Sequence, residues 1–266
     1  MIPNPSSAAE VEQLITDARA ETTKPVGVGF LVPFVVREAV EAAAAVAQVV
    51  EFFYGDPDPE LVRAGKAHGA VLGWQVGSAS EAVRAVDAGC DYVVAQGIEA
   101  GGHVRGTQAL DDVLRETLAA VDVPVIAAGG VGSGARVAAL LESGAAGVRV
   151  GTRFVAAEEA DAHPEYVARL IAASHEDTLL TEAFSVGWPD APHRVLRSAV
   201  EAAELLDRPV AATLGARDIP RFASAPPTKQ ARGEIAAMAL YAGESVDAVL
   251  RVQPAAEIMA ELTSQL

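Results

Sequence analysis

The 266-residue chain has one cysteine, few aromatic residues and little positive charge. The single cysteine, Cys90, excludes an intramolecular disulfide and a zinc site built on several cysteines. Lysine and arginine total 20 against 36 acidic residues, which gives a net charge of −16. Because nucleic-acid binding depends on clustered basic side chains, this balance disfavours DNA or RNA as a partner. A single phosphate group remains compatible with it, since backbone amides at helix N-termini bind phosphate without side-chain charge.

The chain also lacks the segments that direct a protein to a membrane or to export. No uninterrupted apolar run reaches about 18 residues, so we expect no transmembrane helix. The first residues, MIPNP, have neither the positive start nor the apolar core of a signal peptide. We therefore expect a cytoplasmic protein.

What the sequence does contain is a regular alternation of apolar strand-like runs and helical segments. Hydrophobic residues make up 51% of the chain but aromatic residues only 5%, as in parallel strands rich in valine and buried on both faces. About six strands separated by helices predict a parallel sheet, either doubly wound or closed as a barrel. The predicted strands cover residues 26–32, 49–54, 71–76, 91–96, 124–128 and 147–150.

Two of these strands end in glycine turns that could hold a phosphate. The strand before Gly129 leads into GGVGSG at residues 129–134, the first glycine turn, and then into a helix. The next strand ends at Gly151-Thr152, the second glycine turn. Glycine lets a backbone approach a ligand closely, and paired turns of this kind bind phosphate after the last two strands of a β/α barrel. Their spacing fits neither a Walker loop nor a Rossmann dinucleotide motif.

A third segment, the glycine loop at residues 96–106, carries the candidate catalytic side chains. A buried strand delivers Gln96 to its carboxyl end, and the following glycines present His103. The carboxamide of Gln96 offers a donor and an acceptor to a heteroaromatic ring or a substrate oxygen. Histidine can accept or hold a proton near neutral pH. The other histidines show no metal-ligand spacing, so we expect no metal.

These motifs together resemble the nitronate monooxygenase family, formerly called 2-nitropropane dioxygenases. The resemblance rests on AQGIEAGGH at residues 95–103, AAGGV at 127–131 and GVRVGTRF at 147–154, and it extends to WPDAPHRVL at 188–196. Bacterial FMN-dependent enoyl-acyl-carrier-protein reductases share much of the same frame. The resemblance implies a TIM-barrel-like (β/α) fold with FMN at the carboxyl end of the strands, and oxidation of alkyl nitronates by O2.

The resemblance also assigns roles to individual residues. Gly129, Gly130, Gly151 and Thr152 would hold the FMN phosphate, whereas Gln96, Gly101 and Gly102 would line the flavin and substrate. His103 corresponds to the histidine that deprotonates a nitroalkane or orients a nitronate. Arg153 is either a phosphate ligand or an outward-facing charge.

Two departures from the family pattern bear on these expectations. Where relatives carry asparagine near the flavin, this chain has Gly29, which offers no side chain. The chain also starts at about the second helix of the family, so the first two strands are expected to be absent. A late start, a partial relative, or a partner chain that covers the gap, as in a homo-oligomer, would each explain this.

The sequence therefore predicts a partial barrel that binds FMN over residues 1–175. Residues 176–266 are expected to be mostly helical and to cover the barrel mouth, with a helix over residues 234–240. The expected substrate is a small molecule, a nitronate or similar, which would be oxidised to a carbonyl compound and nitrite. Two alternatives are an enoyl-acyl-carrier-protein reductase-like enzyme and an inactive flavin-binding remnant.

Overall fold

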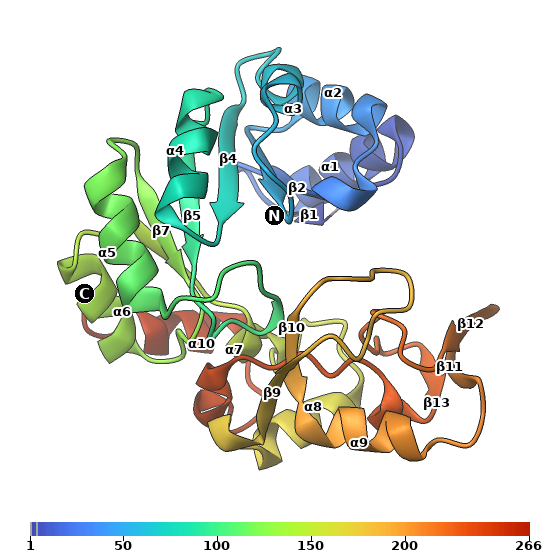
Figure 1. The fold of residues 1–266 in the computed structure, drawn as a ribbon. Helices are drawn as coiled ribbons and strands as arrows, with labels where there is room; N and C mark the ends of the chain where they lie inside the picture. Colours follow the sequence, from blue (N-terminus) through green and yellow to red (C-terminus); the bar gives the residue numbers. More distant parts are fainter. Residues whose placement is uncertain (1, 4) are drawn as a thin grey trace. The chain divides into compact units, whose positions relative to one another are not determined.

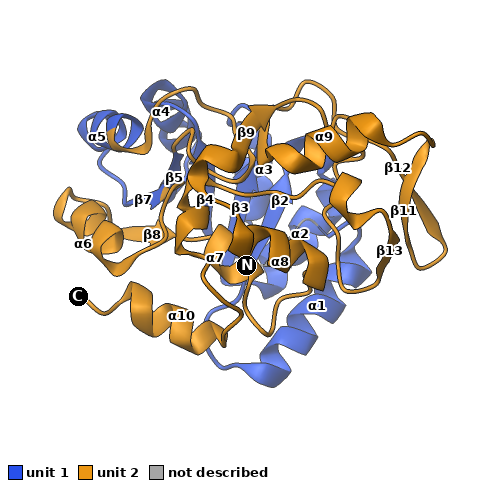
Figure 2. Cartoon of the chain, turned by 90° about the horizontal axis from the view of Figure 1, so that it is seen from below, with its two compact units in different colours: residues 1–96, 112–127 blue, residues 97–111, 128–266 orange. Residues whose placement is uncertain are grey.

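The computed structural model describes residues 2, 3 and 5–266, and its contacts divide the chain into two compact units. The first unit comprises residues 1–96 and 112–127, and the second comprises residues 97–111 and 128–266 (Figure 2). The chain passes from the first unit to the second directly after Gln96, so the glycine loop belongs to the second unit from Gly97 onward.

The first unit is a parallel α/β structure. Its sheet has the strand order β1-β2-β3-β4-β5-β7, and the registered pairs from β1 to β5 are all parallel. Strands and helices alternate along the chain (Figure 1), which confirms the predicted TIM-barrel-like (β/α) fold. The strands are β1 (Ile2–Pro3), β2 (Gly27–Leu31), β3 (Val49–Phe53), β4 (Val71–Val76), β5 (Tyr92–Gln96) and β7 (Val125–Ala128). The helices are α1 (Ala8–Glu21), α2 (Arg37–Val46), α3 (Pro59–Gly65), α4 (Ala79–Asp87) and α5 (Leu110–Ala120).

Local side-chain caps explain where several of these helices begin. Ser7 and Ser78 stand at the N-cap positions of α1 and α4, and each hydroxyl accepts a hydrogen bond from a backbone N–H three residues on. At α4 the carboxylate of Glu81 reaches back and accepts from the N–H of Gly77 at 2.8 Å. These bonds satisfy backbone donors that a helix leaves without partners in its first turn.

An aromatic row crosses the sheet of the first unit. Phe30, Phe52 and Trp74 lie in register on β2, β3 and β4, and all three are fully buried. The ring centroids of Phe30 and Phe52 are 5.8 Å apart, and those of Phe52 and Trp74 are 5.0 Å apart. The same face packs against α3, where a Cβ at Gly65 would lie only 3.5 Å from the ring of Phe52. This row is the centre of the core between sheet and helix.

The opposite face of the same strands carries a polar row. Gly29, Glu51, Gly73 and Tyr92 lie in register on β2 to β5, one residue before the aromatic row on β2, β3 and β4. Because successive residues of a strand point to opposite faces, this row lies away from α3. The hydroxyl of Tyr92 donates to the carboxylate of Glu51 at 2.8 Å, so the buried acid has a specific donor. Gly73 makes room for the Tyr92 ring between them.

The second unit combines a further strand–helix segment with two small antiparallel sheets. One sheet joins β6 (Gly102–His103), β10 (His193–Leu196) and β9 (Thr178–Thr181), and the other joins β12 (Arg217–Pro220), β11 (Val210–Leu214) and β13 (Ala231–Gly233). The remaining strand is β8 (Gly147–Arg149). The helices are α6 (Gly134–Glu142), α7 (Thr152–Val155), α8 (Pro164–Ala172), α9 (Arg197–Leu205) and α10 (Ala255–Leu262).

Three-residue and five-residue 3-10 helices complete the elements. Among its described residues, the first unit contains one 3-10 helix, η1 (Val32–Phe34). The 3-10 helices of the second unit are η2 (His175–Asp177), η3 (Ile235–Ala237) and η4 (Glu244–Ala248). Each is too short to bury a continuous apolar face, and η3 and η4 instead contribute single residues such as Ile235 and Val246 to the cores of the second unit.

The secondary structure predicted for residues 176–266 is wrong in two respects. Strands β9 to β13 lie in a segment that the sequence predicts to be mostly helical, and residues 234–240 contain η3 rather than a longer helix. Gly233, the last residue of β13, has φ of +128°, a value that favours glycine. The strands are short, and their partners are distant in sequence, so local periodicity does not reveal them. The predicted division at residue 175 stays a prediction.

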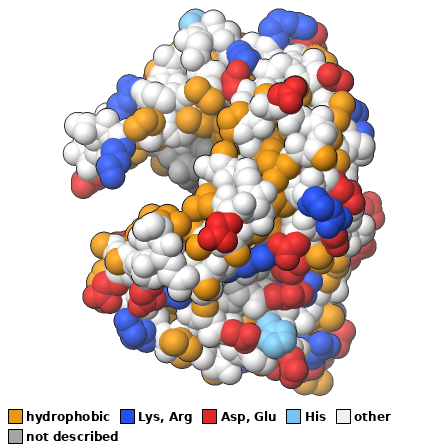
Figure 3. All heavy atoms as spheres, turned by 90° about the vertical axis from the view of Figure 1, so that its left-hand side faces the viewer, with side chains coloured by type: hydrophobic (Ala, Val, Ile, Leu, Met, Phe, Trp, Pro, Cys, Tyr) orange, Lys and Arg blue, Asp and Glu red, His pale blue; other side chains and the backbone are white. Residues whose placement is uncertain are grey.

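Surface features are consistent with an acidic chain. Acidic and basic side chains are interspersed on the face drawn in Figure 3, with hydrophobic side chains scattered among them. Within the described part of the chain, no helix combines the length and the apolar character needed to cross a membrane.

Cys90 is buried, and desolvation raises the pKa of its thiol to about 12.

The polar row makes a first testable prediction. A Cβ at Gly73 would lie 2.1 Å from the Tyr92 ring, so Gly73→Ala should lower the free energy of unfolding by about 1–3 kcal/mol. Gly147→Ala is the control, because no described heavy atom lies within 4 Å of a Cβ there. Urea unfolding of Gly73→Ala in wild-type and Tyr92→Leu backgrounds measures the coupling. Equal losses in both backgrounds would contradict the assignment of the clash to the ring.

Candidate functional site

The glycine loop is held in place by its own backbone and by one carboxylate. The N–H of Ile98 donates to the carbonyl of Gln108 at 2.9 Å. The carboxylate of Glu99 accepts the N–H of Leu110, the first residue of α5, at 3.0 and 3.1 Å. These contacts close the loop on itself within the second unit and give it one defined conformation.

A buried arginine holds the same loop from β10. Arg194 is 8% exposed, and its Nε and Nη2 donate to the carbonyl of Ile98 at 3.2 and 2.9 Å. Its Nη1 donates to Thr178 Oγ1 at 3.2 Å, and its Nη2 lies 3.1 Å from the carboxylate of Glu244. The planar guanidinium supplies several donors in fixed directions, which suits it to a carbonyl that must not move.

Two glycines allow a second segment to cross the loop at very short range. A Cβ at Gly101 would lie 2.4 Å from the nitrogen of Gly243, and a Cβ at Gly243 would lie 2.7 Å from the nitrogen of Gly101. The N–H of Gly243 donates to Thr152 Oγ1 at 3.0 Å, so the hydroxyl of the second glycine turn anchors this crossing. The next N–H, that of Glu244, donates to the carbonyl of Glu99 at 3.0 Å. Glycine is therefore required at 101 by packing alone.

His103 lies among aromatic rings at the end of this loop. Its imidazole stacks on Trp188 with ring centroids 3.7 Å apart, and it lies 5.2 Å from His193 and 5.6 Å from Tyr241. Burial, and to a smaller extent the neighbouring His193, lowers the pKa of His103 to about 3. The ring is therefore neutral at physiological pH and presents one nitrogen as a proton acceptor.

His193 is fixed in one tautomer by the backbone. It is fully buried, its Nδ1 lies 2.8 Å from the carbonyl of Ala191, and its Nε2 lies 3.1 Å from the N–H of Phe184. A carbonyl can only accept and an N–H can only donate, so Nδ1 carries the proton and Nε2 is bare. Burial also lowers the pKa of His193, and two neutral imidazoles can therefore lie side by side.

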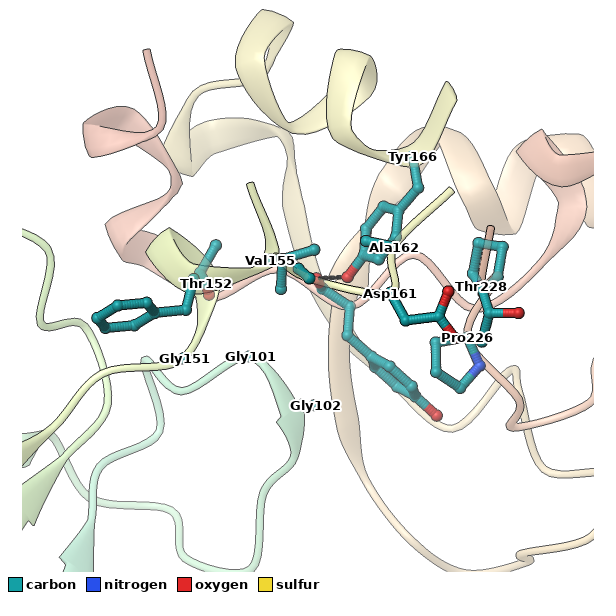
Figure 4. A pocket seen from close by; sticks show the side chains of 14 residues that line it. Gly101, Gly102, Gly151, Thr152, Val155, Asp161, Ala162, Tyr166, Pro226 and Thr228 are labelled. Carbon is teal, nitrogen blue, oxygen red and sulfur yellow. Dashed lines mark hydrogen bonds between the residues drawn. The ribbon is translucent and has the colours of Figure 1, made fainter. Parts of the chain in front are cut away.

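A pocket of about 440 Å³ opens in the second unit beside four of the predicted site residues, Gly101, Gly102, Gly151 and Thr152 (Figure 4). Its volume is in the range of small-molecule sites. Most of its other lining residues are apolar, and among the described ones Asp161 alone carries a charge. The hydroxyl of Tyr166 donates to the backbone carbonyl of Tyr241, and the hydroxyl of Tyr241 donates to the carbonyl of Ser224, so both rings are held at their hydroxyl ends.

The first glycine turn is explained largely by packing within the chain. Gly129 and Gly130 have φ of +110° and +63°, values that favour glycine. A Cβ at Gly129 would lie 3.0 Å from the carbonyl oxygen of Gly97, and one at Gly130 would lie 3.1 Å from Cβ of Glu99. The turn therefore packs against the glycine loop. Neither Gly129 nor Gly130 lines the pocket.

At the second glycine turn, unlike the first, packing within the chain does not explain why the residue is glycine. At Gly151 φ is −115°, which other residues adopt readily, and no described heavy atom lies within 4 Å of a Cβ built there. Gly102 likewise faces open space, although its φ is +80°. Packing does not require glycine at 151, and the space that its missing side chain leaves lies on the pocket. A flavin phosphate or ring placed there fits the residues present.

The remaining predicted residues fall outside the pocket. Gln96 is buried at the end of β5 in the first unit. Arg153 points inward rather than toward solvent: its side chain is 9% exposed and pairs with Glu261. The sequence did not single out Arg194, Gly243, Tyr166 or Tyr241, whose partners lie far along the chain.

The sequence that contains the glycine loop, the two glycine turns and His103 matches a known family. A family model described as "Nitronate monooxygenase" matches residues 5–265, which is nearly the whole chain. The chain belongs to the nitronate monooxygenase family. It is therefore a member of a family of oxidoreductases, as the motifs predicted.

Individual relatives are similar to this chain over most of its length. A nitronate monooxygenase of Paraburkholderia phytofirmans is 34% identical over 231 residues, which cover 82% of this chain and 60% of that protein. A 5-hydroxy-7a-methyl-1-oxo-octahydro-1H-indene-4-carboxyl-CoA dehydrogenase of Rhodococcus jostii is 34% identical over 71% of this chain and 52% of that protein. Among solved structures, a nitroalkane oxidase from Streptomyces ansochromogenes has a TM-score of 0.74 at 26% identity, covering 98% of this chain and 85% of that one. The chain spans about half the length of the curated relatives it matches.

The buried arginine makes a testable prediction for this member of the nitronate monooxygenase family. Arg194→Met keeps the side-chain length but removes the donors to Ile98, and should lower the free energy of unfolding by about 2–4 kcal/mol. Amide hydrogen exchange in the glycine loop should accelerate more than exchange in α8. Arg197→Met, at an exposed position three residues on, should cost less than about 0.5 kcal/mol. Unchanged exchange in the loop would show that Arg194 does not hold it.

Proposed function

We propose that this chain catalyses the FMN-dependent oxidation of alkyl nitronates by O2, yielding a carbonyl compound and nitrite. The net reaction balances as two nitronate anions and one O2 giving two carbonyl compounds and two nitrite ions. FMN, when bound, supplies the redox chemistry that passes electrons from the nitronate to O2. Membership of the family supports this proposal, and the observation that carries it is the open space at Gly151 and Gly102 beside the pocket.

The residues of the chain have distinct roles in this proposal. Backbone N–H groups at Gly129, Gly130, Gly151 and Thr152 would hold the FMN phosphate, since amides bind phosphate without basic side chains. Gly101 and Gly102 would allow close approach of the flavin or substrate. Gln96, at the end of β5, remains a predicted flavin contact.

His103 would hold or accept a proton at the substrate carbon or the nitro oxygen. Its lowered pKa keeps the ring neutral, so a ring nitrogen can accept a hydrogen bond or a proton from a bound group, but the same shift weakens the ring as a base. Stacking on Trp188 fixes the plane of the ring and restricts the directions in which it can act. The neutral ring adds no charge to the site, so an anionic nitronate is not drawn in by a cationic histidine.

Spectroscopy and turnover of the purified chain test this proposal. The protein should be yellow with a flavin spectrum, should release FMN on denaturation, and should consume O2 and release nitrite when given a nitronate. His103→Asn should lower kcat/KM about 100-fold or more with a neutral nitroalkane and much less with a preformed nitronate, because the lost group is a proton acceptor. A colourless protein that binds no added FMN would refute the proposal, whereas a protein that binds FMN but releases no nitrite from a nitronate would be an inactive flavin-binding remnant.

A second candidate, an FMN-dependent thioester oxidoreductase, is favoured by one specific comparison. The Rhodococcus jostii relative is named as a carboxyl-CoA dehydrogenase and matches 71% of this chain. Anaerobic mixing with NADPH separates the two candidates. A reductase of enoyl-acyl-carrier-protein type should lose its yellow colour rapidly, whereas a nitronate oxidase should keep it until a nitronate is added.

The open second glycine turn makes a prediction that does not depend on turnover. Gly151→Val places a side chain in the space assigned to the flavin, and should raise the Kd for FMN roughly tenfold or more. It should change the free energy of unfolding by less than about 0.5 kcal/mol, because the side chain meets no described neighbour. Gly147→Val is the matched control, since it is equally open but does not line the pocket. Equal Kd values for the two variants would show that the FMN phosphate does not bind at this turn.

A further inference from the structure

Arg153 connects the two glycine turns. It follows directly after Thr152 of the second turn, and its Nη1 donates to the carbonyl of Gly132 in the first turn at 3.1 Å. The side chain is 9% exposed, so the guanidinium lies inside the second unit and has been removed from water. A buried arginine is stable only if its donors are paired, and this pairing fixes its position.

The charge of Arg153 is balanced by the C-terminal helix. Its Nη2 pairs with the carboxylate of Glu261 on α10. The same carboxylate accepts from Gln253 Nε2 at 3.0 Å and lies 3.3 Å from Arg251 Nη2. The hydrogen bonds from Arg153 and Gln253 lower the pKa of Glu261, so the carboxylate is ionised throughout the neutral range.

The same helix packs directly against the first glycine turn. A Cβ at Gly134 would lie 2.8 Å from the carbonyl oxygen of Glu261 and 2.9 Å from Ser264 Oγ. A Cβ at Gly132 would lie 2.9 Å from Cβ of both Ser245 and Ala248 in η4. The part of the first turn at Gly132 and Gly134 thus packs against residues from the last 25 positions of the chain.

We propose that Arg153 and Glu261 are a positioning pair that sets the distance between the two glycine turns and so makes α10 part of the phosphate site. The ligand in this proposal rests on the proposed function. Neither side chain contacts the phosphate. Glu261 holds the guanidinium, and the guanidinium holds the carbonyl of Gly132, so the two turns stay at a fixed distance from each other.

A comparison of FMN with riboflavin tests the phosphate half of this inference, which is that the pair affects binding of the FMN phosphate. FMN and riboflavin differ only in the phosphate, and fluorescence titration of the flavin-free full chain gives a Kd for each. Glu261→Gln, at a side chain 43% exposed, should raise the Kd for FMN roughly 5- to 20-fold and leave that for riboflavin within about twofold. Arg153→Lys should do the same, because lysine keeps the charge but loses the fork of donors. The control is Arg251→Gln, an exposed partner of the same carboxylate, which should leave the ratio of the two Kd values unchanged.

Amide hydrogen exchange tests the positioning half without any flavin. In Glu261→Gln, amides 130–134 and 152–155 should exchange faster than in the wild type, and amides of α8 should not. If both flavins weaken equally, or if only α10 exchanges faster, the pair stabilises the chain without positioning the turns, and the inference is wrong. If the wild type binds neither flavin, the proposed function and the phosphate half fail together. The exchange result then still decides whether the pair sets the geometry of the turns.

Discussion

The crossing of Gly101 and Gly243 is the constraint on which the candidate site depends. Two backbone segments meet there at a distance that no side chain would permit, since a Cβ on either glycine would lie 2.7 Å or less from the other segment. The hydrogen bond from Gly243 to Thr152 brings the second glycine turn to the same point. The glycine loop, the second turn and the segment that leads into η4 are therefore joined at one point.

Arg194 makes this crossing rigid at a modest cost in desolvation. Burying an unpaired guanidinium would cost several kcal/mol, but here the carbonyl of Ile98 accepts two of its donors and Thr178 accepts a third. Its carboxylate partner, Glu244, is 39% exposed, so only one member of the ion pair is fully withdrawn from water. The arrangement keeps the loop that carries His103 in place without burying two charges.

The sequence predicted those parts of the molecule that depend on neighbouring residues. Apolar runs located strands β2, β3, β4, β5 and β7 of the first unit, because the residues of each strand are contiguous in the sequence. The glycine motifs located the loop and both turns. Arg194 and Ile98 are 96 residues apart, and Arg153 and Glu261 are 108 apart, so no local pattern could pair them. The orientation of Arg153 was left open for the same reason.

The glycines show most clearly what sequence alone could not separate. Gly101, Gly129 and Gly132 are required because another part of the chain lies against them, whereas Gly151 has neither a close neighbour nor a restrictive φ. In the sequence both kinds occur in the same motifs. A ligand can contact a glycine closely only where the chain itself does not, so the open position at Gly151 is the stronger indication of a binding site. The tightly packed glycines instead determine where the open one is held.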